Sequence, residues 1–245
     1  MIEALRSGFP KLKYTTAGVN VVLAGNSLIV GYGTTANSNA IGPQLKAMST
    51  LNNLVTPLMR GVSGQTTRQM NGLDGGTGLA ALQSSWVEGK VNVMIVWEYT
   101  NSIFNTGNNR TGVQAAQDMA DFIAARLAEH PWRIVVMTGL PRFQITPPAG
   151  TTIDSLNAEM NIANQLMRDN FRAWGAVALC EMRGTGTLFD LPNYAFSTFD
   201  ALQYNGVSPW TSTTYDAAGN HIHLSDTGYT IPSIALNNTL ARLPA

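Results

Sequence analysis

Residues 19–28 read Val-Asn-Val-Val-Leu-Ala-Gly-Asn-Ser-Leu, an apolar run that passes directly into a glycine, an asparagine and a serine. The nearly continuous hydrophobicity of Val19–Ala24 is typical of a strand buried on both faces, as in a parallel sheet. A serine just beyond the carboxyl end of such a strand lies where open α/β sheets bind their ligands. The segment therefore predicts a buried first strand and makes Ser27 a candidate functional residue.

Further apolar, β-branched runs follow, at Asn53–Met59, Val91–Trp97, Arg133–Thr138 and Ala176–Cys180. Apolar residues at helical spacing fill Thr111–Glu129, in a stripe that includes Val113, and Ile153–Trp174. Because strands and helices alternate, we expect an α/β fold, a three-layer α/β/α sandwich. The expected sheet is flavodoxin-like, with five parallel strands in the order 2-1-3-4-5.

The chain of 245 residues is predicted to form a single domain over residues 1–245, with an N-terminal extension at 1–17. Residues 183–222 have no clear hydrophobic period, and loops of this length in compact domains are usually functional. They hold seven of the chain's twenty aromatic residues, namely Phe189, Tyr194, Phe196, Phe199, Tyr204, Trp210 and Tyr215. We expect these rings to cover a substrate, to form a small core of their own, or to do both.

The composition excludes several partner classes. Fifteen Lys and Arg balance fifteen Asp and Glu, and charged residues make up 12% of the chain, about half the usual share. The chain carries 21 Asn and 25 Thr instead. With no basic stripe, we expect no nucleic-acid partner.

Location and cysteine chemistry are also constrained. No apolar run has the length of a signal peptide core or a membrane span, so we expect a soluble protein, for which a cytoplasmic and a virion-associated location both fit. The single cysteine, Cys180, excludes an intramolecular disulfide and follows an apolar run, which predicts a buried structural thiol. The oligomeric state stays open.

Four blocks occur in order along the chain: Gly-Asn-Ser-Leu at 25–28, Arg-Gly-Val-Ser-Gly-Gln-Thr-Thr at 60–67, Glu-Tyr-Thr-Asn at 98–101, and Asn-His-Ile-His-Leu-Ser at 220–225. Gly228 follows the last block. This order resembles the SGNH hydrolase superfamily, the GDSL-type lipases and esterases, over most of the chain from about Val19 to Leu240. The resemblance implies a serine esterase.

The resemblance implies that Ser27 is the nucleophile and His223 the general base. The backbone N–H groups of Ser27 and Gly64, with the side-chain amide of Asn101, would form the oxyanion hole. A serine hydroxyl needs a base to become nucleophilic, and an oxyanion needs preorganised donors. The resemblance implies no cofactor and no metal, and its substrates are small-molecule or glycan esters. The neutral surface and the aromatic residues favour an acetylated carbohydrate.

Two asparagines depart from the family pattern. Asn26 stands where Gly-Asp-Ser-Leu has its aspartate, which we expect to act chiefly as a hydrogen-bond acceptor. Asn220 stands where the family has the aspartate that orients the base, a change that costs much turnover in a Ser-His-Asp triad. Three explanations are open. Asn220 presents its amide oxygen to His223, or a carboxylate from elsewhere in the chain orients His223 instead. In the third, catalysis is weakened and the protein is a carbohydrate-binding module. The candidate carboxylates are Asp216, Asp226 and Glu98.

Each residue also has a purely structural interpretation. Ser27 alone would be a helix N-cap, Gly64 a turn glycine and Asn101 a capping amide. Glu98 would be a solvated acid at a strand end. Two further histidines are less favoured as the base: His130 precedes a proline at a helix end, where we expect a solvated residue, and His221 lacks the family's following residues.

Overall fold

The computed structural model describes residues 18–48, 57–105, 107, 109–140, 142, 147–182 and 223–243. The predicted extension at 1–17 and the aromatic-rich segment at 183–222 lie outside the described residues, and so do Asn220, Asp216 and His221.

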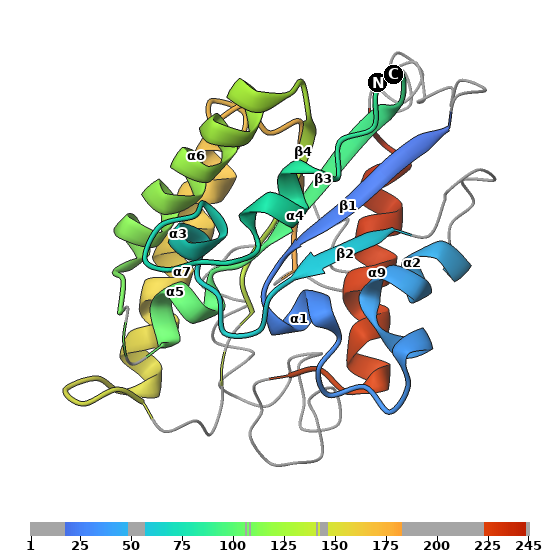
Figure 1. Ribbon diagram of the computed structural model, residues 1–245. Coiled ribbons are helices and arrows are strands. Elements are labelled where there is room, and N and C mark those ends of the chain that lie inside the picture. Colours follow the sequence, from blue (N-terminus) through green and yellow to red (C-terminus); the bar gives the residue numbers. More distant parts are fainter. Residues whose placement is uncertain are drawn as a thin grey trace, which may run out of the picture.

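A parallel sheet forms the centre of the structure (Figure 1). Its strands are β1 (Val19–Gly25), β2 (Leu58–Gly61), β3 (Val91–Trp97), β4 (Arg133–Met137) and β5 (Ala178–Cys180). They are hydrogen-bonded in the order β2-β1-β3-β4-β5, and each neighbouring pair is parallel. The predicted strand order is therefore confirmed. Two strands differ from their predicted bounds by two residues. The second ends at Gly61 instead of Met59, and the predicted residues 53–56 lie outside the described part. The fifth begins at Ala178 instead of Ala176.

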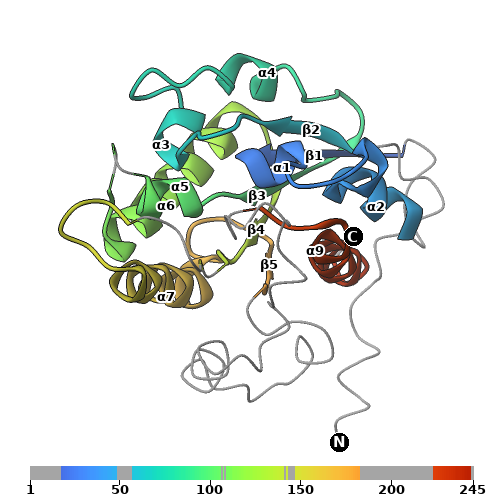
Figure 2. The same cartoon turned by 90° about the horizontal axis from the view of Figure 1, so that it is seen from below.

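Helices cover both faces of the sheet (Figures 1 and 2). On one face α2 (Ile41–Met48) packs against α9 (Asp226–Leu240), and on the other α6 (Gly112–Glu129) packs against α7 (Ile153–Asn170). The short helices are α1 (Ser27–Val30), the 3-10 helix η2 (Asn37–Asn39), α3 (Thr67–Met70), α4 (Leu79–Gln83) and α5 (Thr100–Phe104). The predicted three-layer α/β/α architecture is thus confirmed.

Strand β1 shows why its sequence is almost continuously apolar. Val21 and Leu23 belong to the core cluster beneath α2 and α9, whereas Val22 and Ala24 belong to the cluster beneath α6 and α7. Successive side chains of a strand point to opposite faces, and both faces are covered here. No polar face remains, so the strand reads as one hydrophobic run.

The predicted stripe of α6 is partly wrong. Val113 is 60% exposed, while Ala115 and Phe122 are buried beside the predicted Met119. A Cβ on Gly112 would lie 2.2 Å from the carbonyl oxygen of Glu159 in α7. The two helices are therefore in close contact at Gly112, and the next residue, Val113, is exposed to solvent.

Helix α7 ends at Asn170, four residues before the predicted end, and it buries two asparagines that an apolar stripe does not reveal. Asn164 accepts from the N–H of Gly139 at 2.7 Å and donates to its carbonyl at 3.0 Å. Asn157 pairs in the same way with the backbone of Arg142. Both amides hold the chain that follows β4, because buried backbone groups need hydrogen-bond partners.

Candidate active site

The serine turn begins where β1 ends. Asn26 is the N-cap of α1, and its side-chain oxygen accepts from the N–H of Leu28 at 2.9 Å. Ser27 is the first residue of the helix, so its purely structural interpretation as the N-cap is wrong. Gly25 makes the turn sterically feasible, since a Cβ there would lie 2.4 Å from the carbonyl oxygen of Trp97 in β3. The turn places the buried Ser27 side chain just past the carboxyl end of the sheet.

His223 lies 196 positions further along the chain, and its Nε2 is 3.0 Å from the Oγ of Ser27. It directly precedes the fully buried Leu224 and the N-cap of α9, Ser225, whose hydroxyl accepts from the N–H of Gly228 at 3.1 Å. In the tautomer with the proton on Nδ1, the serine hydroxyl donates to Nε2, the arrangement in which an imidazole can remove the hydroxyl proton.

The second block begins in the last residues of β2, and its backbone hydrogen-bonds the backbone of the first block. The N–H of Val62 donates to the carbonyl of Gly25 at 3.0 Å, and the N–H of Gln65 donates to the carbonyl of Val62 at 3.2 Å. Gly64 has φ +75° in this turn. This left-handed conformation favours glycine, and a Cβ at this position would meet no atom of the described residues within 4 Å.

Asn101 lies in the first turn of α5 and joins the third block to the second. Its side-chain N–H donates to the carbonyl of Gln65 at 3.0 Å. A side-chain amide carries two protons, so one more remains for a ligand at the sheet edge. Ser27, Gly64, Asn101 and His223 thus come from four distant segments, joined here by the contacts described.

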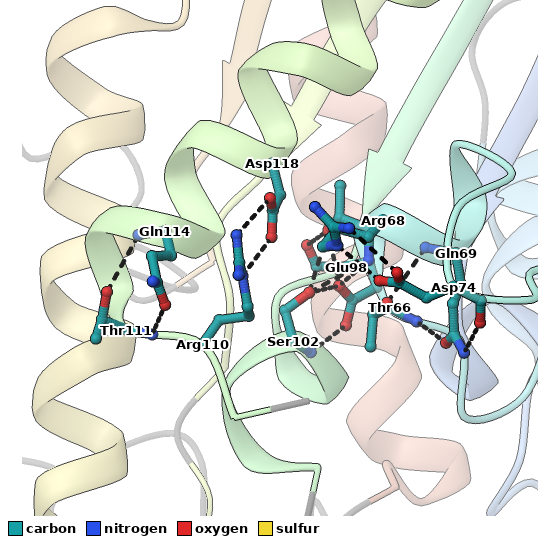
Figure 3. Close-up of polar contacts among 11 residues, drawn as sticks. Thr66, Arg68, Gln69, Asp74, Glu98, Ser102, Arg110, Thr111, Gln114 and Asp118 are labelled. Atoms are coloured by element: carbon teal, nitrogen blue, oxygen red, sulfur yellow. Dashed lines mark hydrogen bonds and ion pairs between the residues drawn. The ribbon is translucent and has the colours of Figure 1, made fainter. Parts of the chain in front are cut away.

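Glu98 is not the solvated strand-end acid of the structural interpretation: it is 1% exposed. Its Oε2 accepts from the N–H of Thr67 at 2.9 Å, from the Thr67 hydroxyl at 2.8 Å and from the Ser102 hydroxyl at 2.7 Å. Its Oε1 accepts from the N–H of Asn101 at 2.7 Å. Figure 3 shows Glu98 beside Ser102 and close to Thr66, the N-cap of α3.

Burial raises the pKa of the Glu98 carboxyl, and the hydrogen bonds from Ser102 and Thr67 oppose that shift. The described groups that hydrogen-bond its carboxylate belong to Asn26, Thr67, Asn101 and Ser102. Glu98 therefore does not orient His223, and this alternative is wrong.

Asp226 is also engaged elsewhere. It accepts from both the N–H and the hydroxyl of Thr35, and these hydrogen bonds hold the pKa of its carboxyl below the ordinary value. Of the groups considered for orienting His223, Asp216 and Asn220 remain, and both lie outside the described residues.

Tyr32 is a neighbour of the site that the sequence did not single out. Its ring centroid lies 5.5 Å from that of His223, at an interplanar angle of 31°, and the side chain is 50% exposed. The Tyr32 carbonyl accepts from the hydroxyl of Tyr229 in α9 at 3.0 Å. A single exposed tyrosine after a short helix carries no pattern that distinguishes it, so only its spatial position reveals the contact.

Two other expectations concern residues away from the site. His130 does follow the end of α6, but its ring stacks on Trp86 with centroids 4.7 Å apart, so it is not simply solvated. Cys180 is fully buried as predicted, and burial raises the pKa of its thiol to about 12.

Within the described part of the chain, no group of three or more His, Cys, Asp or Glu side chains is arranged to hold a metal ion. In the same residues, none of the helices has both the length and the apolar character needed to cross a membrane.

No protein-family model and no curated protein matches the sequence. Solved structures do match. A protein assigned to the GDSL-like lipases from Parabacteroides merdae is 13% identical over 92% of this chain and 96% of that chain, with a TM-score of 0.59. A carbohydrate acetylesterase family member from Sinorhizobium meliloti is 14% identical over 89% and 96%, with a TM-score of 0.56. A variant of an acetyl-xylooligosaccharide esterase from a Geobacillus species is 12% identical over 90% and 93%, with a TM-score of 0.52.

Identities this low speak for the fold and not for a shared substrate. The matches nevertheless cover about nine-tenths of this chain and nearly the whole length of these proteins. The resemblance that the four blocks suggested is thereby confirmed at the level of architecture: the chain has the fold of the SGNH, or GDSL-type, hydrolases.

Proposed function

We propose that the chain is a serine esterase in which Ser27 is the nucleophile and His223 the general base. The observation that carries this proposal is the 3.0 Å contact between the Ser27 Oγ and the His223 Nε2 at the carboxyl end of β1. Solved structures of esterases and lipases with the same fold support an ester hydrolase at this coarse level.

In the proposed reaction the Ser27 oxygen adds to the ester carbonyl carbon while His223 takes the hydroxyl proton. The backbone N–H groups of Ser27 and Gly64 and the Asn101 amide donate to the oxyanion that forms. The carbon–oxygen bond to the alcohol then breaks, and His223 returns its proton to the leaving alcohol. Water, deprotonated by His223, hydrolyses the acyl-enzyme and releases the acid.

A fluorophosphonate probe and p-nitrophenyl acetate test this proposal directly. We expect the probe to modify Ser27, and we expect Ser27→Ala and His223→Ala to lower turnover by about 10⁴-fold or more. Ser84→Ala is the matched control: it removes an exposed hydroxyl next to Ser85, whose carbonyl accepts from Asn20 at the start of β1. Equal labelling or turnover in Ser27→Ala and the wild type would exclude the proposed nucleophile.

We propose acetylated carbohydrate as the substrate class. The neutral composition and the aromatic residues of 183–222 support it. Acetate release from acetylated xylooligosaccharides should be faster than hydrolysis of p-nitrophenyl octanoate. A preference for the octanoyl ester would point to a lipid ester instead.

The second candidate function is a carbohydrate-binding module with the same fold, favoured by Asn220 in the place of the family's aspartate. The two candidates differ in the response to Asn220→Asp. For an esterase weakened at this position, the change should raise turnover, because a carboxylate stabilises the imidazolium better than an amide does. A binding module would bind acetylated glycan without labelling of Ser27.

A further inference from the structure

Glu98 is a buried carboxylate that the proposed reaction does not use. It is 1% exposed. A carboxylate that leaves water loses its hydration free energy, and hydrogen bonds within the protein must compensate for that loss. Here the donors include the backbone N–H groups of Thr67 and Asn101, which cannot be reversed into acceptors. The side chain thus joins the start of α3, in the second block, to the start of α5, in the third block.

The serine turn reaches the same carboxylate through Asn26. The Asn26 side-chain N–H donates to the Glu98 Oε1 at 3.3 Å, while its oxygen accepts from the N–H of Leu28. An aspartate at this position would also accept from Leu28, but it would place a second negative charge against Glu98. Asparagine combines the acceptor that the turn uses with a donor for Glu98.

We propose that Glu98 and Asn26 form a carboxylate–amide pair that positions the Ser27 turn relative to the second and third blocks. Glu98 is then a positioning residue for the esterase reaction proposed above, on which this inference rests. It touches no reacting atom; it acts through the turn that carries the nucleophile and through the N–H of Asn101.

A charge exchange between the two positions tests the pair. Asn26→Asp should slow phosphonylation of Ser27 by about tenfold or more, because two carboxylates in contact repel each other. Glu98→Gln should also slow it, because the new NH2 group would face a backbone N–H of Thr67 or Asn101. In the double variant one carboxylate and one amide face each other again, and phosphonylation should be faster than in Asn26→Asp alone.

The pH profile separates positioning from a general loss of stability. The described groups that hydrogen-bond Glu98 are the neutral side chains or N–H groups of Asn26, Thr67, Asn101 and Ser102. In Asn26→Asp the two carboxyl groups can share one proton, so its rate relative to wild type should recover as the pH falls from about 8 to about 6. A merely destabilised protein would show no such recovery.

Asn92→Asp is the matched control, since Asn92 is a buried asparagine at the start of β3, at the opposite end of the strand from Glu98. It should lower stability without slowing phosphonylation of the folded protein. If Asn26→Asp does not fold, Asn26→Ala replaces it, because the cycle with Glu98→Gln then measures the pair without an added charge.

The free energy of unfolding in urea is measured for every variant of the cycle. If Ser27 in the wild type is not labelled, the esterase proposal fails, but non-additive unfolding free energies would still establish the pair. If the double variant is slower than Asn26→Asp and the unfolding effects add, the pair is disproved even though the enzyme is active.

Discussion

The two central strands, β1 and β3, carry a buried polar cluster at each end, and the two clusters differ in chemistry. At the starting end, the Asn20 amide donates to the Asn92 side-chain oxygen at 2.7 Å, and Asn92 donates to the carbonyl of Val87 at 2.8 Å. At the carboxyl end, Glu98 accepts from Asn26 and from the segments around Thr67 and Asn101.

The two clusters differ in chemistry because they hold different kinds of segment. The amides both donate and accept, so they can pair with the backbone N–H and C=O groups of a neighbouring turn. Because they are neutral, their desolvation costs little free energy. A carboxylate only accepts, and it can gather donors from several segments at the price of desolvation. The neutral end joins strands that would pair anyway, whereas the charged end joins short helices and turns that carry the candidate catalytic groups.

Replacing an amide at each end gives the largest expected contrast. Asn101→Ala should lower turnover by about 10²–10³-fold, because it removes a donor to the oxyanion. Asn92→Ala should instead cost about 1–3 kcal/mol of unfolding free energy, because it leaves the backbone partners of Asn92 without their hydrogen bonds. It should leave kcat unchanged. Steady-state kinetics with p-nitrophenyl acetate and urea unfolding measure the two effects. Similar kinetic losses in both variants would remove the distinction between the ends.

The same glycine-to-alanine change at each end should give the second-largest contrast, measured as unfolding free energy. Gly25→Ala should cost about 3 kcal/mol or more, because its Cβ would strike the backbone carbonyl of Trp97 at 2.4 Å. Gly89 precedes β3 with φ +74° and open space around a Cβ, so Gly89→Ala should cost only about 1–2 kcal/mol of backbone strain. Urea unfolding gives both values. Equal costs would mean that the serine turn can yield to the added methyl group.

Each end also has a histidine against an aromatic ring. Tyr32→Ala should lower kcat roughly three- to fivefold, because its ring faces the imidazolium that His223 becomes, and Tyr32→Phe should retain activity. Trp86→Ala, which removes the ring stacked on His130, should lower stability and leave kcat unchanged. A kinetic effect of Trp86→Ala as large as that of Tyr32→Ala would contradict this division.

The smallest effect is a difference in pH dependence between two acids. Burial raises the pKa of Glu98, so between its ordinary value of 4.5 and the raised value the folded form keeps a proton that the unfolded chain has lost, and stability falls as pH rises. The lowered pKa of Asp226 has the opposite sign: its contribution is present above 3.8 and is lost as pH falls. Urea unfolding from acidic to neutral pH should therefore show Glu98→Gln gaining stability relative to wild type with rising pH. Asp226→Asn should lose stability relative to wild type, and parallel curves for all three proteins would disprove both assignments.

The sheet could be predicted from sequence because burial on both faces leaves a continuous apolar run, as in Val19–Ala24 and Val91–Trp97. Strand ends and helix faces were harder. The exposure of Val113 depends on where α6 touches α7, and Asn157 and Asn164 are buried because a loop after β4 needs their amides. Such contacts join distant segments, so no local pattern records them.

The order of the four blocks and the kinds of side chain in them are properties of the chain itself, since each block follows a strand or precedes a helix whose signal is local. Which side chains contact one another is not a local property, because it depends on distances in space between segments that are far apart in the sequence. Only the folded chain brings His223 to Ser27 across 196 positions, turns Asp226 toward Thr35, and buries Glu98. The physical reason is that an asparagine, an aspartate or a glutamate has the same local preferences whichever partner it meets, and the partner is chosen by packing.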